Sequence, residues 1–312
     1  MRIISASEVE AQLETEPLVE QLRQMFRTGC VVPTRHHHTI PMTGGDATLL
    51  LMPAWQDNRY IGVKIVTVFP NNLRRNLPSV MGAYVLISAR TGEPLALIDG
   101  RMLTLRRTAC ASALAARYLA RQDANRLLMV GTGALAPQLI LAHAHVRPLR
   151  EVLVWGRTAA KAERLAQTLT GRHLTVRATA DLEAAARGAD IISCATLAHE
   201  PLIKGEWLRP GQHVDLVGGF TPEMREADDT AIERARVYVD TYDGALKEAG
   251  DIVQPLASGV LRREQIAGDL AELAQGRVPG RSFYNQITLF KSVGTALEDL
   301  AAAALVFERT LS

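Results

Sequence analysis

A glycine-containing turn directly after an apolar run is the clearest chemical signature in the sequence. Residues 127–136 read Leu-Leu-Met-Val-Gly-Thr-Gly-Ala-Leu-Ala, which places the pattern G-x-G-x-x-A between an expected strand and an expected helix. Gly131 permits the tight turn, Gly133 lets the backbone approach a pyrophosphate, and Ala136 lets the helix pack closely. Because the first N–H groups of a helix bind phosphates, the stretch predicts a dinucleotide site that includes Thr132 and Ala134.

The end of the next expected strand, at 151–155, indicates which dinucleotide binds. The chain continues there as Gly-Arg-Thr and lacks the Asp or Glu that would bind the ribose 2′-hydroxyl of NAD. Arg157, Thr158 and Lys161 could instead hydrogen-bond and neutralise a 2′-phosphate. We therefore predict NADPH as the cofactor, with NADH as the weaker alternative.

One lysine lies inside an otherwise apolar run, and two arginines elsewhere could join it. Residues 60–69 read Tyr-Ile-Gly-Val-Lys-Ile-Val-Thr-Val-Phe, with Lys64 near the middle. A buried lysine needs an anion, whereas a lysine in an edge strand can reach water. Arg35 and Arg107, each taken alone, could equally lie on a solvent-exposed face. Together the three cations suit the carboxylate of a small amino-acid-like substrate, because guanidinium groups bind carboxylates in a bidentate manner.

Two other kinds of site are not favoured by the sequence. Adjacent residues of an extended segment point to opposite sides, so His36, His37 and His38 cannot easily converge on one metal ion. No serine stands in a G-x-S-x-G elbow, which argues against a hydrolase of that type.

Length and composition indicate a two-domain enzyme. A chain of 312 residues exceeds the size at which one core usually stops growing. The formal charge of +2 gives no reason to expect a nucleic-acid or membrane partner, and no apolar stretch is long enough to span a bilayer. The N-terminus becomes acidic before any signal-type apolar core develops, so we expect a cytoplasmic protein. Cys30, Cys110 and Cys194 are far apart and are expected to be free thiols.

Apolar runs and amphipathic segments alternate from residue 127 onward, which is typical of a doubly wound parallel sheet. Strands are expected at 127–131, 151–155, 174–178, 190–195, 212–217 and 236–240, and helices at about 134–146, 159–170, 181–187 and 242–249. Before this region, strands at 46–55, 60–69, 80–89 and 93–99 are joined by turns without helices, which predicts an antiparallel or mixed sheet.

Three further helices complete the prediction. They are expected at 7–28, 102–121 and 286–309, and the polar segment 121–126 is expected to be the linker between domains. The fold class is therefore α/β, with a Rossmann domain at 122–287 and a smaller α+β domain for substrate binding and dimerisation at 1–121 with 288–312. The last helix carries apolar residues at helical spacing and is expected to return to the first domain.

Five segments, in this order, resemble the ornithine cyclodeaminase and mu-crystallin family across nearly the whole chain. They are Lys64-Ile-Val-Thr-Val-Phe-Pro-Asn-Asn, Leu77-Pro-Ser-Val-Met-Gly-Ala-Tyr-Val-Leu, Thr91-Gly-Glu-Pro-Leu-Ala-Leu-Ile-Asp-Gly, Leu105-Arg-Arg-Thr-Ala and the Gly131 turn. The resemblance implies a homodimer whose site lies between a substrate domain and a Rossmann domain. It also implies carboxylate binding by Arg35, Lys64 and Arg107, a substrate-facing hydroxyl at Ser79, and cofactor contacts at the Gly131 turn, Thr196, Val217, Gly218 and Ser292.

One departure from the family's pattern bears on the activity. The resemblance implies that a cyclodeaminase has an aspartate directly after the Val-Gly-Gly turn, where this chain has Phe220. An aromatic ring makes the pocket more apolar and suits a compact cyclic imine, although Phe220 could also be core filler. The stretch is similar to that of members that reduce Δ1-pyrroline-2-carboxylate to L-proline and Δ1-piperidine-2-carboxylate to L-pipecolate. We therefore predict an NADPH-preferring reductase of such imines, with ornithine cyclodeaminase, alanine dehydrogenase and a non-catalytic ligand carrier as alternatives.

Overall fold

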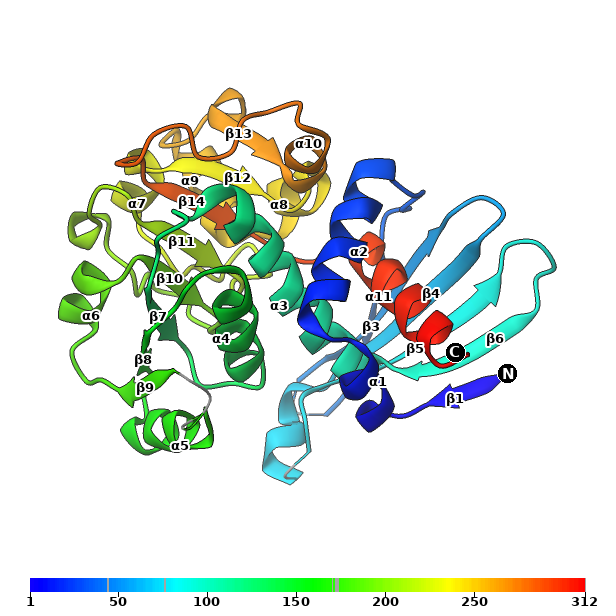
Figure 1. The fold of residues 1–312 in the computed structure, drawn as a ribbon. Helices are drawn as coiled ribbons and strands as arrows, with labels where there is room; N and C mark the ends of the chain where they lie inside the picture. Colours follow the sequence, from blue (N-terminus) through cyan, green and yellow to red (C-terminus); the bar gives the residue numbers. More distant parts are fainter. Residues whose placement is uncertain (44, 76, 170, 172–173, 312) are drawn as a thin grey trace. The chain divides into compact units, whose positions relative to one another are not determined.

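The computed structural model describes residues 1–43, 45–75, 77–169, 171 and 174–311 (Figure 1). The chain forms two compact units, one made of Met1–Arg107 with Thr295–Ser312 and the other of Thr108–Gly294. The boundary between Arg107 and Thr108 lies inside a continuous helix, α3 (Gly100–Leu119). The sequence analysis had expected this boundary after the helix. Residues 121–126 connect α3 to the next strand within the second unit, so they do not separate the two units.

The first unit is built on a six-stranded mixed sheet, as expected from the sequence. Its order is β1-β6-β5-β4-β3-β2, with β1 parallel to β6 and the other described pairs antiparallel. The sequence analysis identified the four central strands but not the short strand β1 or the polar edge strand β2. The strands are β1 (Arg2–Ile4), β2 (His36–Ile40), β3 (Ala47–Trp55), β4 (Tyr60–Val68), β5 (Val80–Ser88) and β6 (Pro94–Asp99), and a 3₁₀ helix η1 (Pro70–Arg75) precedes β5.

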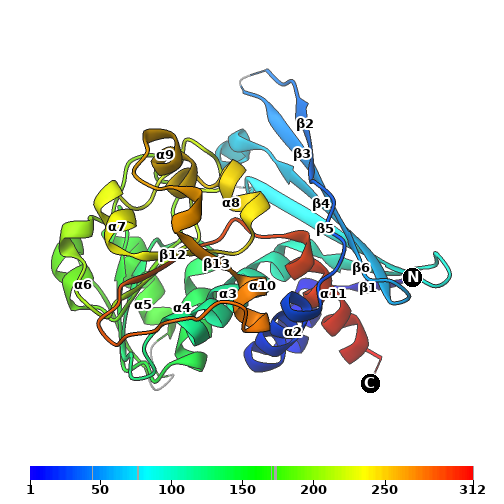
Figure 2. The ribbon, with the colours of Figure 1, turned by 90° about the horizontal axis from the view of Figure 1, so that it is seen from above.

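Helices cover one face of this sheet. Helix α11 (Ala296–Arg309) packs on β3, β4 and β5, and α2 (Thr15–Thr28) packs on α11, while the β2–β3 ribbon extends beyond them (Figure 2). The single helix predicted for 7–28 is two helices, α1 (Ala6–Gln12) and α2. A capping box between Ser5 and Glu8 starts α1, and Pro17 in the first turn of α2 needs no backbone N–H there.

The second unit is built on an eight-stranded parallel sheet, which confirms the predicted Rossmann architecture. Its order is β13-β12-β14-β11-β10-β7-β8-β9, so β9-β8-β7-β10-β11 reproduce the doubly wound order around β7, and β14 lies between β11 and β12. The strands are β7 (Arg126–Val130), β8 (Glu151–Trp155), β9 (Thr175–Ala178), β10 (Ile191–Cys194), β11 (His213–Leu216), β12 (Arg236–Val239), β13 (Ile266–Asp269) and β14 (Thr288–Lys291).

Helices flank this sheet, and α4 and α6 lie to either side of β7 in Figure 1. The helices are α4 (Leu135–Val146), α5 (Ala159–Leu169), α6 (Leu182–Gly188), α7 (Asp229–Arg234), α8 (Tyr242–Glu248), α9 (Gly250–Ser258) and α10 (Leu270–Gln275), with 3₁₀ helices η2 (Gly205–Trp207) and η3 (Arg263–Gln265). No helix in the described part of the chain is long and apolar enough to cross a membrane.

The last helix was predicted at 286–309, but the first part of this range is strand β14. The predicted start of the helix is therefore wrong. Thr288–Lys291 is buried on both faces between β11 and β12, so its apolar residues do not alternate with polar ones as they do in a half-exposed strand. The helical part begins only at Ala296, after a Thr295 N-cap, and continues to Arg309.

Candidate functional site

The glycine turn after β7 has the geometry that a dinucleotide requires. Gly131 has φ 120°, and a Cβ atom at this position would lie 2.5 Å from the carbonyl oxygen of Ala195. A Cβ atom at Gly133 would meet no described atom within 4 Å, so the backbone there is open to a ligand. Helix α4 follows, and no described side chain caps its first amides. The turn therefore fits a pyrophosphate at the helix N-terminus.

The second turn, after β8, lies against the first. A Cβ atom at Gly156 would be 2.7 Å from Cγ2 of Thr132, so the two turns are in close contact. Arg157, Thr158 and Lys161 are exposed at the start of α5, where they are accessible to the adenosine ribose of a dinucleotide. The structure thus brings these predicted residues to the edge of the sheet that carries the glycine turn.

The predicted contacts after β10 and β11 also lie at the carboxyl ends of their strands. Thr196 donates its amide and its hydroxyl to Oε1 of Glu226, both at 2.7 Å. Val217 donates its amide to the carbonyl of Cys194 at 2.8 Å, which joins the two strand ends. Gly218 follows directly. Ligands of doubly wound sheets bind outside these carboxyl ends, so the placement fits the predicted roles.

Ser292 follows β14 and is buried. Its hydroxyl donates to Oδ2 of Asp240 at 3.2 Å, and the same oxygen accepts the amides of Val293 at 2.8 Å and Gly294 at 2.7 Å. Asp240 therefore fixes the backbone at the predicted cofactor contact Ser292. The sequence analysis did not identify Asp240, although an acid directly after an apolar strand was a usable signal.

The lysine in the apolar run is buried, and the protein itself supplies an anion. Lys64 Nζ lies 2.9 Å and 2.7 Å from the two carboxylate oxygens of Asp299, and Arg107 Nε lies 2.9 Å from Asp299 Oδ1. Arg107 also donates to Glu298 Oε2 at 2.7 Å. The acids of α11 were missed because they lie in a stretch interpreted only as an amphipathic helix.

Cations outnumber acids among the five charged groups Arg35, Lys64, Arg107, Glu298 and Asp299. Lys64 and Arg107 are paired with Glu298 and Asp299, and the third cation, Arg35, is half-buried just before β2. Desolvation, followed by the charges of Arg107 and Arg35, lowers the pKa of Lys64 to about 8 despite Asp299. A bound carboxylate would favour the charged form of Lys64.

Ser79 and Phe220 lie in different units. Ser79 is half-buried just before β5, and its carbonyl accepts the amide of Phe69 at 2.7 Å. Phe220 in the second unit has 43% of its surface exposed, so it is not core filler. It follows Gly219, whose φ of 59° turns the chain outward after β11. Its ring is therefore available for contact with a ligand.

The histidine run forms the edge strand β2. His36 and His38 pair with Leu51 and Leu49 of β3, and His37 lies between them with the opposite orientation. Among the residues that the structure describes, no group of three or more His, Cys, Asp and Glu side chains could hold a metal ion.

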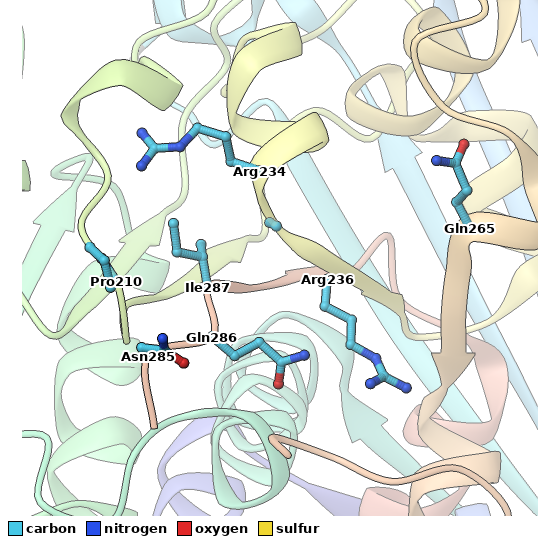
Figure 3. Close-up of a pocket in the computed structure, with 8 residues that line it drawn as sticks. Pro210, Arg234, Arg236, Gln265, Asn285, Gln286 and Ile287 are labelled. Carbon is cyan, nitrogen blue, oxygen red and sulfur yellow. The ribbon is translucent and has the colours of Figure 1, made fainter. Parts of the chain in front are cut away.

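A pocket in the second unit lies at the opposite edge of the sheet from the turns (Figure 3). Its lining residues precede or begin strands β11 to β14, so it is at the amino ends of the strands. They are Pro210, Arg234, Ala235, Arg236, Gln265, Asn285, Gln286 and Ile287. A dinucleotide binds at carboxyl ends, so this pocket is not the cofactor site.

Comparison with known proteins agrees with this arrangement. The family model described as "Ornithine cyclodeaminase/mu-crystallin family" matches residues 2–312. The chain belongs to this family. A curated relative, Protein SAR DEFICIENT 4 of Arabidopsis thaliana, is 46% identical over 90% of this chain and 87% of its own. Another, the Delta(1)-pyrroline-2-carboxylate reductase of Colwellia psychrerythraea, is 38% identical over 99% of both chains.

A solved structure from the family is similar over the whole chain. It is the Delta(1)-pyrroline-2-carboxylate reductase of Thermococcus litoralis in complex with NADH and L-proline, with a TM-score of 0.94 and 32% identity, covering 100% of this chain and 98% of that one. The family membership predicted from the sequence motifs is confirmed.

Proposed function

We propose that the protein reduces cyclic ketimine carboxylates, converting Δ1-pyrroline-2-carboxylate to L-proline and Δ1-piperidine-2-carboxylate to L-pipecolate with a nicotinamide cofactor. The observation that carries the proposal is the buried pair of cations Lys64 and Arg107, which is held by Glu298 and Asp299. The half-buried Arg35 is close enough to lower the pKa of Lys64, so three cations surround the place proposed for a single carboxylate. The named reductases among the relatives act on this class of substrate and support the proposal.

In this reaction the protein's own residues bind and orient the substrate. Lys64 and Arg107 anchor the carboxylate, and the counter-ions on α11 hold both side chains in place. The Ser79 hydroxyl hydrogen-bonds the imine nitrogen, directly or through water. The bound cofactor supplies hydride to the imine carbon. An imine that binds already protonated needs no acid from the protein.

The finer assignment of the cofactor is NADPH. The absence of an acid after β8 and the exposed cations Arg157 and Lys161 support it, because a 2′-phosphate there would be neutralised and not repelled. The Thermococcus litoralis enzyme is described with NADH, so the comparison supports a nicotinamide cofactor in general.

We further propose a homodimer formed through the uncovered face of the six-stranded sheet. Residues on this face point away from α11 and remain half-buried or exposed: Ile3, Leu51, Pro53, Val63, Ile65, Ala83, Val85 and Leu97. Such a continuous apolar face is typical of an interface. In sedimentation experiments, Ile65→Glu should shift a dimer to a monomer, and an unmodified monomer would refute the proposal.

Turnover assays separate the proposed function from its alternatives. Oxidation of NADPH should be followed with pyrroline carboxylate, with piperidine carboxylate and with pyruvate plus ammonia. We expect turnover with the cyclic imines. Turnover only with pyruvate and ammonia would indicate an alanine dehydrogenase, ammonia release from ornithine a cyclodeaminase, and binding without turnover a ligand carrier.

A further inference from the structure

A buried charge cluster lies beneath the turn that follows β11. Lys291, the last residue of β14, is fully buried, and its ammonium group lies 3.0 Å from Oδ2 of Asp251 on α9. The same group donates to the carbonyl of Gly218. Lys291 therefore connects the turn after β11 to helix α9.

The cluster continues from Asp251 to the end of β10. Oδ1 of Asp251 accepts the amides of Glu226 at 2.8 Å and Ala227 at 3.0 Å. Glu226 accepts the amide and the hydroxyl of Thr196. One connected set of interactions thus holds the chain after β10 and the chain after β11, where the predicted cofactor contacts Thr196 and Gly218 stand.

The turn is pressed against this cluster. A Cβ atom at Gly218 would lie 2.2 Å from the carbonyl oxygen of Thr196 and 2.4 Å from Oε1 of Glu226. At Gly219 it would lie 2.9 Å from Oδ2 of Asp251 and 3.2 Å from Nζ of Lys291. The turn can approach so closely only because both residues are glycine, and its position follows the cluster.

Burying these charges has an energetic cost that an apolar strand residue at 291 would avoid. Desolvation raises the pKa of Glu226 to about 7, although Lys291 opposes the shift. Replacing buried charges by apolar residues is often neutral or stabilising in proteins. Lys291 does what an apolar residue cannot, because it donates a charge-assisted hydrogen bond to a turn carbonyl.

We propose that Lys291 is a positioning residue that holds the Val217–Gly218 turn for the nicotinamide half of the cofactor. The inference rests on the proposed function, which requires such a cofactor. The glycine turn after β7 and the turn after β8 form the site of the adenosine half. Since a dinucleotide crosses the point where strand order reverses, its other half lies over the ends of β10 and β11.

Binding measurements test the inference without turnover. Lys291→Met keeps the length of the side chain but removes its charge, and Lys247→Met makes the same change at an exposed position of α8. Isothermal titration should compare NADPH with adenosine 2′,5′-bisphosphate, which lacks nicotinamide. We expect Lys291→Met to weaken NADPH binding about tenfold or more and the fragment less than about twofold, as the turn loses a charge-assisted bond. Lys247→Met should leave both unchanged.

The other outcomes overturn the inference. Equal losses for NADPH and the fragment would make Lys291 a structural residue of the whole unit, and unchanged binding would give it no role. If Lys291→Met fails to fold, Asp251→Asn should give the same difference between the two ligands. An unmodified protein that binds no NADPH or NADH would refute the proposed function as well.

Discussion

Nζ of Lys64 lies 2.7 Å from Oδ2 of Asp299, and both side chains are buried. The lysine comes from β4, and its counter-ion comes from α11, close to the end of the chain. Asp299 also accepts a hydrogen bond from Arg107, so one carboxylate orients two cations proposed to bind substrate. Burial alone would raise the pKa of Asp299, but Arg107 and Lys64 together lower it, so the carboxylate stays charged.

The first prediction concerns the stability that Asp299 provides. Asp299→Asn should lower the free energy of unfolding by about 3 to 5 kcal/mol, because Lys64 and Arg107 would remain buried with only Glu298 as a counter-ion. Urea denaturation measures the change. Glu308→Gln is the control, since it breaks an exposed pair with Arg59 and should cost at most about 1 kcal/mol. Equal effects of the two substitutions would contradict the role of Asp299.

The second prediction follows from the lowered pKa of Lys64. With a pKa of about 8 in the free protein, Lys64 loses its charge as pH rises through 8, so carboxylate binding should weaken above that pH. The inhibition constant of L-proline, measured from pH 7 to 9.5, should increase with pH. Lys64→Met should bind L-proline weakly, with KM raised and kcat lowered for the imine, and should lose this pH dependence. A flat profile in the unmodified protein would contradict the prediction.

Periodicity and turn residues were sufficient to predict strands β7 to β12 of the parallel sheet, because each is a short run rich in apolar residues and helices of distinct pattern separate β7 to β10. They failed for β14, whose four residues are buried on both faces and are continued by apolar residues at helical spacing. The polar edge strand β2 gave no signal either. In both cases tertiary pairing, and not local pattern, determines the strand.

The cations of the candidate site could be predicted, but their counter-ions could not. Lys64 could be identified as a candidate because it interrupts an apolar run. The sequence left two possibilities for it, burial beside an anion or exposure to solvent. Glu298 and Asp299 are typical of acids in the first turn of a helix, where a negative charge interacts favourably with the helix dipole. Only the packing of α11 on β4 brings them to Lys64 and Arg107, and no sequence spacing records that contact.

The third prediction concerns cofactor preference. If Arg157 binds the 2′-phosphate, the unmodified protein should use NADPH with a higher kcat/KM than NADH, and Arg157→Ala should reduce that ratio. Loss of one charge-assisted contact should cost about 1.5 to 3 kcal/mol for NADPH alone. Arg164→Ala, on helix α5, which follows Arg157, serves as the control. Equal efficiencies with the two cofactors in the unmodified protein would refute the preference.

The fourth prediction concerns acid stability. Burial lowers the pKa of His213 from 6.5 to about 3, and Thr288, 3.0 Å from its Nδ1, donates its own hydroxyl to Leu119, so Nδ1 carries the proton. The unfolded chain therefore binds more protons between pH 6.5 and 3, and stability should fall by up to about 5 kcal/mol as pH decreases through this range.

A variant isolates this effect. His213→Asn keeps an N–H donor for Thr288 but does not titrate, so its unfolding free energy should depend less on pH than that of the unmodified protein. His145→Asn, at an exposed position of α4, should leave the pH dependence unchanged. If the two variants show the same slope of stability against pH, His213 is not the titrating group.

The last prediction concerns Phe220, which stands where the resemblance places the aspartate of a cyclodeaminase. The unmodified protein should release no ammonia from L-ornithine yet oxidise NADPH with the cyclic imine. Phe220→Asp should lower kcat/KM for the imine by roughly tenfold to a hundredfold, because burial of an aromatic ring against the substrate is worth about 1.5 to 3 kcal/mol. Phe283→Asp changes another exposed phenylalanine of the same unit and should have no effect. Ammonia release at a rate comparable to imine reduction would refute both the role of Phe220 and the choice of reductase over cyclodeaminase.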